Sequence, residues 1–205
     1  MKPYPSIPSW SRAGGTPVCV FDKLDGSNVK AEVTRKGKIE KFGKRDGLLD
    51  EQTPYLIQAA ALIPEKYGED LCRLVHDQRW ERATFYFEFW GPRSAFGWHA
   101  DEPHTVTLFD CAPDKRGLLE PREFLKLCGN MDHAKLLHVG NFTHEVAEAV
   151  SNSTLDGMTC EGVVAKGSAD RKTGMPLMFK WKSLRWLTML RERCGDNLAL
   201  YNKLS

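Results

Sequence analysis

Period-two alternation of apolar and polar residues is the feature that most constrains the fold of this chain. Val29, Ala31 and Val33 alternate with polar neighbours, and a Lys- and Gly-rich turn at 35–38 brings the chain back through a second apolar stretch that ends at 42. The segment 83–90 alternates in the same way, with phenylalanines on one face and Tyr86 and Glu88 on the other. Such alternation is typical of half-buried strands. The sequence therefore predicts a hairpin over 29–42 and a further strand over 83–90.

The remaining elements are predicted from apolar periodicity and from Pro and Gly breaks. Strands are expected at 18–21, 105–109, 162–165 and 177–181, and helices at 55–62, 65–75, 121–128 and 144–150. Pro64 is expected to separate the first two helices, and Gly195 to interrupt a helical tail over 184–205. Hairpins with helices between them indicate an α+β fold of antiparallel sheets rather than regular βαβ winding. With 205 residues, a single domain over 1–205 is expected, with 1–15 as an extended lead-in.

Composition excludes several classes of protein. Six scattered cysteines without a Cys-x-x-Cys pair argue against a zinc site or a disulfide framework, and no cysteine partners His99 and His104 at metal-ligand spacing. No apolar run approaches the length of a membrane span, and the first residues lack the apolar core of a signal peptide. A cytoplasmic protein with its cysteines in the reduced thiol form is therefore expected. The formal charge is only +2, but basic residues cluster at 30–45 and 166–185, the second cluster including Arg171 and Lys172.

A short segment between two predicted strands is the first that indicates chemistry. Lys23-Leu24-Asp25-Gly26 places an amine and a carboxylate at a tight bend. Alone, this segment is better explained as a hairpin turn, because Asp-Gly is a common turn signal.

Four later features change that interpretation. Glu88 is a lone carboxylate in an aromatic strand, and Phe109 precedes an aspartate at the expected end of the next strand. Glu161 stands at the start of the apolar strand 162–165, while Lys180 and Lys182 share one face of the last strand. Each has an ordinary structural explanation by itself, but their order along one chain points to a shared site.

That order resembles the motifs of the covalent nucleotidyltransferases, the class of ATP-dependent ligases and capping enzymes. The segments are KLDGSN, FYFEFWG, TLFDC, CEGVVAKG and MFKWKS, spread from Asp22 to Ser183. The resemblance implies an adenylation domain of antiparallel sheets flanked by helices, with the ATP pocket between them. Two further features resemble the nick-sealing phage RNA ligases and the RNA-editing ligases. One is Ser27-Asn28, at the place where DNA ligases typically carry an arginine. The other is the later Lys-Arg-Asp-Gly segment around Arg45. The opening Tyr-Pro-Ser-Ile-Pro is also similar to proteins of this kind.

The resemblance implies an ATP-dependent RNA ligase in which Lys23 attacks the α-phosphate of ATP and becomes adenylylated. AMP then passes to an RNA 5′-phosphate, and a 3′-hydroxyl displaces it. Because a lysine attacks phosphorus only as a neutral amine, nearby cations such as Lys180 and Lys182 are expected to lower its pKa.

The resemblance also implies the other roles. For the nucleotide, it assigns the α-phosphate to Lys180 and Lys182, the ribose hydroxyls to Glu88 and Arg45, and the adenine to Phe109. It places Asp22 and Leu24 in the nucleotide pocket and assigns Asn28 to the phosphate in the sealing step. Asp25 and Glu161 are assigned to Mg²⁺ or Mn²⁺, bound through water. For Asp22, an exposed acid at a strand end is an equally good interpretation. Lys166 lies five residues after Glu161, so strand alternation is expected to turn it to the opposite face and it is left out.

Departures from the family shape the remaining expectations. The chain ends soon after Lys182, so neither an OB-fold nor the helical C-terminal domain of nick-sealing RNA ligases is expected. We expect a monomer that acts on RNA with 5′-phosphate and 3′-hydroxyl ends, including nicked duplexes. The alternatives are a minimal ATP-dependent DNA ligase, a GTP-using capping enzyme and a non-catalytic nucleotide- or RNA-binding relative.

Overall fold

The structure, a computed structural model, describes residues 1–9, 16–50, 54–92, 101–169 and 177–205. His99, Arg171, Lys172 and the end of the predicted lead-in (10–15) lie outside the described residues. The chain forms two compact units. Unit 1 contains Met1–Ser6 and Asp25–His133, and unit 2 contains Ile7–Leu24 and Ala134–Ser205. That the whole chain acts as one domain stays a prediction.

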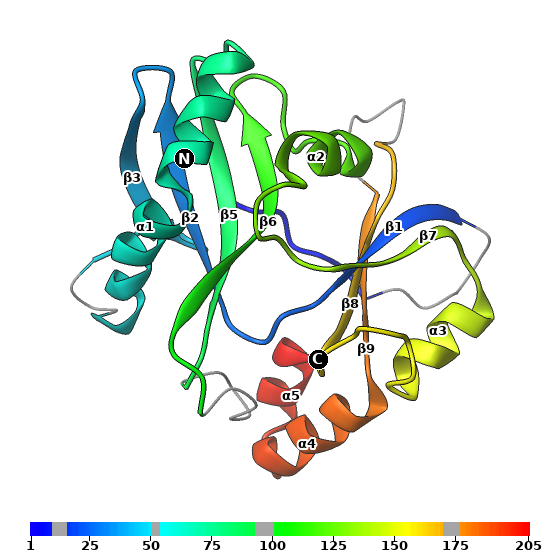
Figure 1. Cartoon of the computed structure of the whole chain (residues 1–205). Helices are drawn as coiled ribbons and strands as arrows, with labels where there is room; N and C mark the ends of the chain where they lie inside the picture. Colours follow the sequence, from blue (N-terminus) through cyan, green and yellow to red (C-terminus); the bar gives the residue numbers. More distant parts are fainter. Residues whose placement is uncertain (10–15, 51–53, 93–100, 170–176) are drawn as a thin grey trace. The chain divides into compact units, whose positions relative to one another are not determined.

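The described part of unit 1 contains one five-stranded antiparallel sheet (Figure 1). Its strands are β2 (Ser27–Thr34), β3 (Lys38–Lys44), β4 (Gly47–Leu48), β5 (Arg82–Trp90) and β6 (Thr105–Pro113). Their order is β4-β3-β2-β5-β6. The predicted hairpin is confirmed as β2 and β3, and Gly37 takes the positive φ of 73° that their turn requires. The aromatic strand is confirmed as β5, while β6 runs four residues beyond the predicted end at Phe109.

One long helix covers a face of this sheet. The prediction of two helices separated by Pro64 is wrong, because α1 (Pro54–Asp77) continues through Pro64. An internal proline costs a helix about 3 kcal/mol. The buried stripe continues on both sides of it, with Leu56 and Ile63 before the proline and Tyr67 and Leu71 after it. Each such side chain contributes about 1.5–3 kcal/mol on burial, so packing outweighs the lost helix hydrogen bond.

The core of unit 1 lies between α1 and the inner face of the sheet. Val29, Phe85 and Phe87 are fully buried there, as period-two alternation predicts. The predicted helix 121–128 is confirmed as α2 (Pro121–Cys128), and its Phe124 belongs to the same core. The opposite sheet face carries the polar side chains of β2 and β5, including Glu88.

The described part of unit 2 has a four-stranded antiparallel sheet in the order β7-β1-β8-β9. The strands are β1 (Thr16–Asp22), β7 (Leu136–Phe142), β8 (Gly162–Lys166) and β9 (Met178–Lys182). β7 has no counterpart among the predicted strands, because its polar and glycine positions, such as Asn141 and Gly140, weaken the apolar signal. The other three strands confirm the prediction to within two residues at either end.

Three helices complete the described part of unit 2. They are α3 (His144–Ser151), α4 (Leu184–Cys194) and α5 (Leu198–Leu204). Ala147 and Val150 of α3 pack with Val163 and Phe179 in the core of this unit. The predicted break in the tail at Gly195 is confirmed. None of the helices in the described ranges is long and apolar enough to cross a membrane.

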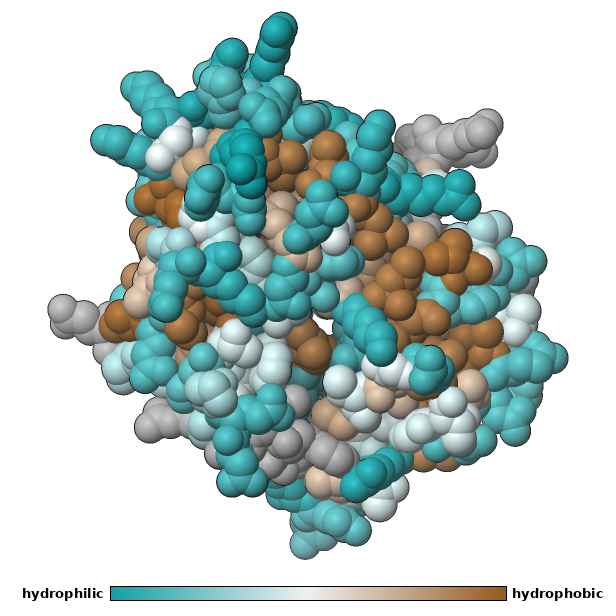
Figure 2. Space-filling model, viewed as in Figure 1, coloured by the Kyte–Doolittle hydropathy of each residue, from teal (hydrophilic) through white to brown (hydrophobic). Residues whose placement is uncertain are grey.

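In Figure 2, viewed from the same side as Figure 1, the surface around the tip of the β2–β3 hairpin is hydrophilic. Arg35, Lys36, Lys38 and Lys41 are exposed there. Lys30, which belongs to the same basic cluster, is instead buried, with 4% of its surface exposed.

Candidate active site

The ends of two neighbouring strands in unit 2 bring three charged side chains together. Lys23 follows β1 and Glu161 precedes β8, and the Lys23 N–H donates to the carbonyl of Gly162 at 3.0 Å. The Lys23 ammonium lies 2.7 Å from one carboxylate oxygen of Glu161, and the Lys182 ammonium lies 2.9 Å from the other. Glu161 thus joins the two lysines, one from the start of the chain and one from near its end.

Gly162 explains how Glu161 can face these lysines. Its φ of 138° lies in a region that side chains rarely adopt, and a Cβ there would come within 2.2 Å of the Trp181 carbonyl oxygen. Ser183 holds the next turn: its hydroxyl donates to the Cys160 carbonyl at 2.8 Å and accepts from the Trp186 N–H, while its own N–H donates to the Glu161 carbonyl at 3.0 Å. The backbone on both sides of Glu161 is therefore fixed.

Burial and charge together determine how these groups ionise. Burial alone would raise the pKa of the Glu161 carboxyl, but Lys23 and Lys182 outweigh it, so the net pKa lies below the usual value. Burial also lowers the pKa of Lys182 to about 8, against the opposing effect of Glu161. The Lys182 ammonium further contacts the Trp186 ring at 3.7 Å and the Leu204 carbonyl at 2.5 Å. The cluster thus holds two cations on one carboxylate.

Asp22 is not the exposed acid that one interpretation expected, since only 4% of its surface is exposed. Its carboxylate accepts hydrogen bonds from the backbone N–H of Thr159 at 3.0 Å and from the Thr159 hydroxyl at 2.9 Å. Burial raises the pKa of Asp22, and the two bonds from Thr159 partly oppose that rise. Asp22 therefore fixes the position of Thr159, two residues before Glu161, by hydrogen bonds. The sequence does not indicate Thr159, because a partner 137 residues away leaves no local signal.

Lys166 lies on a different face of the unit 2 sheet from the one that the sequence predicts. Val164 pairs with Lys180 and Gly162 with Lys182, so Lys166 lies on the same face as both lysines. The prediction that Lys166 faces away from this group is wrong, because the positive φ of Gly162 interrupts the alternation after Glu161. Lys166 is buried, and its ammonium lies 5.0 Å from the centre of the Phe21 ring.

The polar face of the unit 1 sheet carries other residues assigned to the nucleotide. Asn28 of β2 pairs directly with Glu88 of β5, so their side chains share that face. Within the part of the chain that the structure describes, the buried amide oxygen of Asn28 has no hydrogen-bond partner. Arg45 is exposed in the turn between β3 and β4, and the Lys30 ammonium donates to its carbonyl at 3.3 Å. Lys30 thus anchors the turn that carries Arg45.

Phe109 lies at an irregularity in β6, where the pairing register shifts between Tyr86 and Phe87. It is only partly buried, and its ring centre lies 5.0 Å from that of Tyr4 and 6.4 Å from that of Tyr86. The polar face therefore carries a partly exposed aromatic ring that two tyrosine rings support.

The carboxylates assigned to a divalent metal belong to different units. Asp25 is buried at the start of the second segment of unit 1, and Leu24, which precedes it, is partly buried at the end of a unit 2 segment. No group of three or more His, Cys, Asp or Glu side chains occurs among the residues described. Both oxygens of Glu161 already bind ammonium groups. Mg²⁺ usually keeps several of its waters and is bound through one or two carboxylates and substrate phosphates, so it does not require a full set of protein ligands.

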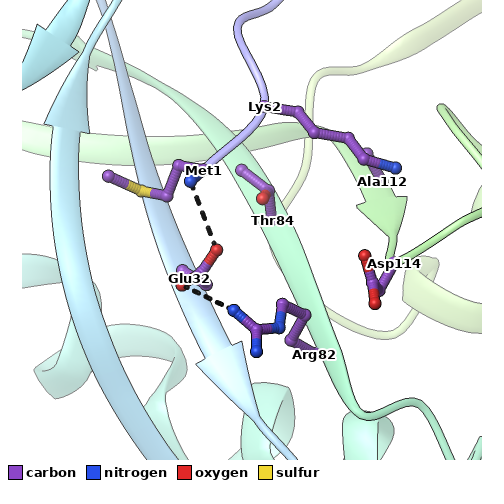
Figure 3. Close-up of a pocket in the computed structure, with 7 residues that line it drawn as sticks. All are labelled: Met1, Lys2, Glu32, Arg82, Thr84, Ala112 and Asp114. Carbon is purple, nitrogen blue, oxygen red and sulfur yellow. Dashed lines mark ion pairs between the residues drawn. The ribbon is translucent and has the colours of Figure 1, made fainter.

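A separate polar pocket of about 310 Å³ lies in unit 1 (Figure 3). Glu32 is buried in it, 3.4 Å from the Met1 ammonium and 3.8 Å from the Arg82 guanidinium. The other lining residues are Lys2, Thr84, Ala112 and Asp114. None of the residues that the sequence assigns to the nucleotide lines this pocket, so it is distinct from the candidate site.

Solved structures share this fold. A variant of the Naegleria gruberi RNA ligase with ATP and Mn matches with a TM-score of 0.61 and 19% identity, over 86% of this chain and 52% of that chain. The same ligase with PPi matches with a TM-score of 0.62 and 20% identity, over 87% and 53%. An archaeal ATP-dependent RNA ligase matches with a TM-score of 0.68 and 17% identity, over 95% and 52%. The chain spans about half the length of these proteins, and at this identity the likeness establishes the fold.

The sequence establishes the family. The family model described as RNA ligase matches residues 16–182, from the start of β1 to the end of β9. The chain therefore belongs to the RNA ligase family, as the order of its motifs predicts. A comparison with curated protein sequences finds no significant match.

Proposed function

We propose that this chain is the adenylylating part of an ATP-dependent RNA ligase and that Lys23 is its nucleophile. The observation that carries the proposal is the 2.7 Å contact between Lys23 and the buried Glu161, which also binds Lys182. An amine at a strand end beside a buried carboxylate and a second cation is an arrangement suited to attack on a polyphosphate.

In the first step, the neutral Lys23 amine attacks the α-phosphorus of ATP. A P–N bond forms, the P–O bond to pyrophosphate breaks, and pyrophosphate leaves with the electron pair of that bond. The ammonium paired with Glu161 must lose one proton before the attack, and the nitrogen loses a second as lysyl-AMP forms. Lys182, with Lys180 from the same strand face, offsets charge on the α-phosphate.

The later steps use the same phosphate site. The 5′-phosphate oxygen of an RNA end attacks lysyl-AMP and releases the Lys23 amine. A 3′-hydroxyl then attacks the 5′-phosphorus, forms the phosphodiester and releases AMP. Each step is an in-line displacement in which positioning and charge neutralisation supply most of the rate.

The residues of unit 1 are proposed to bind the nucleoside. Glu88 and Arg45 are assigned to the ribose hydroxyls, Phe109 to the adenine ring, and Asn28 to the phosphate during sealing. Two features support these roles: the amide oxygen of Asn28 is buried without a hydrogen-bond partner in the described structure, and the Phe109 ring is partly exposed beside the Glu88 face.

Asp22 and Leu24 flank the nucleophile in sequence and are proposed to line the nucleotide pocket. The bonds from Thr159 suggest that Asp22 acts by holding the segment before Glu161. Asp25 and Glu161 are proposed to bind Mg²⁺ or Mn²⁺ through water. When bound, the metal would neutralise charge on the phosphates.

We further propose that the substrate is RNA with 5′-phosphate and 3′-hydroxyl ends, including nicked duplexes, and that the chain acts as a monomer in the cytoplasm. The exposed lysines of the β2–β3 hairpin support phosphate contacts with RNA. None of the six cysteines, all within the described ranges, forms a disulfide, which supports a reducing compartment.

Self-labelling tests the proposal directly. The protein is incubated with magnesium and α-labelled ATP or GTP in parallel, denatured and resolved on a gel. Acid-labile label from ATP is expected on the wild type and absent from Lys23→Ala. Lys126→Ala, which removes an exposed lysine of α2, is the matched control and should label normally.

The other outcomes are equally informative. Label from GTP alone would indicate a capping enzyme, and no label in either lane would favour a non-catalytic binding protein. Nicked duplexes with RNA or DNA at the 3′-hydroxyl side then distinguish an RNA ligase from a DNA ligase. Sealing only with DNA at that side would contradict the proposed substrate.

A further inference from the structure

Tyr4 lies outside the five motif segments between Asp22 and Ser183, reaches the polar face of the unit 1 sheet and contacts the aromatic ring assigned to adenine. Its ring centre lies 5.0 Å from that of Phe109, nearly perpendicular to it, and 5.0 Å from that of Tyr86. Tyr86 and Phe109 themselves lie 6.4 Å apart with their ring planes 29° from parallel. The three rings therefore form one cluster, in which Phe109 is supported from a segment far away in the sequence.

Hydrogen bonds fix Tyr4 in this cluster. Its hydroxyl donates to a carboxylate oxygen of Asp110 at 2.9 Å, and the other oxygen accepts the Cys111 N–H at 3.0 Å. The Tyr86 hydroxyl donates to the carbonyl of Lys2 at 3.1 Å, which ties the same segment to β5. Asp110 is buried, and the Tyr4 hydroxyl gives that oxygen a hydrogen bond away from water.

Burial raises the pKa of Tyr4 well above its usual value, and the nearby Asp110, Tyr86 and Glu88 raise it further. The phenol therefore stays protonated at any working pH and remains a hydrogen-bond donor to Asp110. The influence of Glu88 also brings Tyr4 into the neighbourhood of the residue assigned to the ribose.

The position of Phe109 makes these ring contacts important. Phe109 lies where the register of β5 and β6 shifts, and it is only partly buried. The rings of Tyr4 and Tyr86 both lie against the Phe109 ring and restrict its rotation. A stacking platform binds a base more tightly when its orientation is fixed beforehand.

We propose that Tyr4 is a positioning residue that holds the Phe109 ring in place and so determines how tightly and how selectively the protein binds the base of its nucleotide. This inference rests on the proposed function, because it takes Phe109 as the platform for adenine. Tyr4 acts through Phe109 and touches neither phosphate nor metal in this role.

The test compares Tyr4→Phe and Tyr4→Ala in the self-labelling reaction. Tyr67→Phe is the matched control, because Tyr67 is also buried in unit 1 and donates its hydroxyl to the Val106 carbonyl at 3.0 Å, but it contacts Phe87 rather than Phe109. Loss of one hydrogen bond should raise the KM for ATP about three- to tenfold in Tyr4→Phe while kcat at saturating ATP stays unchanged. Tyr4→Ala also loses two ring contacts and should raise the KM by more than about tenfold.

Competitive inhibition separates base binding from a general structural effect. Adenosine has the base but no phosphate, and tripolyphosphate has phosphates but no base. Both Tyr4 variants should weaken inhibition by adenosine and leave inhibition by tripolyphosphate unchanged. Tyr67→Phe should change neither inhibition constant, although it should lower the melting temperature. If Tyr4→Ala does not fold, Tyr4→Phe alone decides.

Each remaining outcome contradicts the inference. Equal weakening of both inhibitors, a fall in kcat without a change in KM, or an unchanged KM in Tyr4→Phe would show that Tyr4 does not act through the base. Wild-type labelling with unaffected Tyr4 variants would overturn this inference and leave the proposed function intact. Absence of label on the wild type would overturn both.

Discussion

Replacing Thr159 with valine tests how far the Lys23–Glu161 contact depends on the segment that leads into β8. Valine keeps the shape of the side chain but removes the hydroxyl that donates to Asp22 at 2.9 Å. A hydrogen bond to a charged acceptor is worth about 1.5–3 kcal/mol, and the exposure of Thr159 favours the lower end of that range. For a chain of 205 residues, about 1.5 kcal/mol corresponds to a fall of about 3–6 °C in the melting temperature.

The pH dependence follows from the pKa of Asp22. Burial raises that pKa and the bonds from Thr159 lower it, so Thr159→Val should raise it further. A carboxyl with a raised pKa in the folded protein costs stability when it is charged, and that cost disappears as the pH falls through the folded-state pKa. The stability difference between Thr159→Val and the wild type should therefore be largest near neutral pH and shrink on acidification.

Thr154→Val provides the control for this substitution. Thr154 lies in the same connection, is exposed, and donates only to the Ala149 carbonyl at 3.3 Å, so its loss should cost less than about 0.5 kcal/mol. Thermal unfolding measures both variants. Because a small displacement of Glu161 can slow the chemistry, Thr159→Val should also slow Lys23 labelling by about tenfold. The reasoning is refuted if the two valine variants match in melting temperature and labelling rate.

Two further predictions concern the same cluster. Because burial lowers the pKa of Lys182 to about 8, kcat/KM for ATP in the labelling reaction should fall above that pH. Lys182→Arg should keep its positive charge and move this decline to higher pH. An identical pH profile for the two proteins would contradict the role of the Lys182 charge at the phosphate. Gly162→Ala should lose about 3 kcal/mol or more and abolish labelling, since its Cβ would lie 2.2 Å from the Trp181 carbonyl oxygen. A Gly162→Ala protein that unfolds at the wild-type temperature and labels Lys23 would show that the backbone here is not constrained as described.

Local patterns predicted much of the secondary structure. The hairpin β2–β3, the aromatic strand β5 and the helices α2 and α3 follow from periods of two and 3.6 residues, which depend only on near neighbours. The errors arise where tertiary packing outweighs a local signal. α1 continues through Pro64 because its buried stripe offsets the lost bond, and β7 pairs with β1 although its own composition is weakly strand-like.

The candidate site shows the same division. The residue types are readable from the sequence, because a lysine, an acid and paired lysines in a set order carry the chemistry of nucleotidyl transfer whatever their exact placement. The partners of those residues are not readable. Thr159 for Asp22, Lys30 for the Arg45 turn and Tyr4 for Phe109 are joined by contacts that folding alone creates.

The sequence by itself thus determined the family, the antiparallel α+β architecture and the identity of the candidate nucleophile. Tertiary structure decided that Glu161 sits between Lys23 and Lys182, that Lys166 shares their sheet face, and that Asp22 is buried. The physical reason is that motifs and periodicity report the chemistry and the local backbone of each segment. Charge pairing, desolvation and strand register arise only when segments more than a hundred residues apart come together.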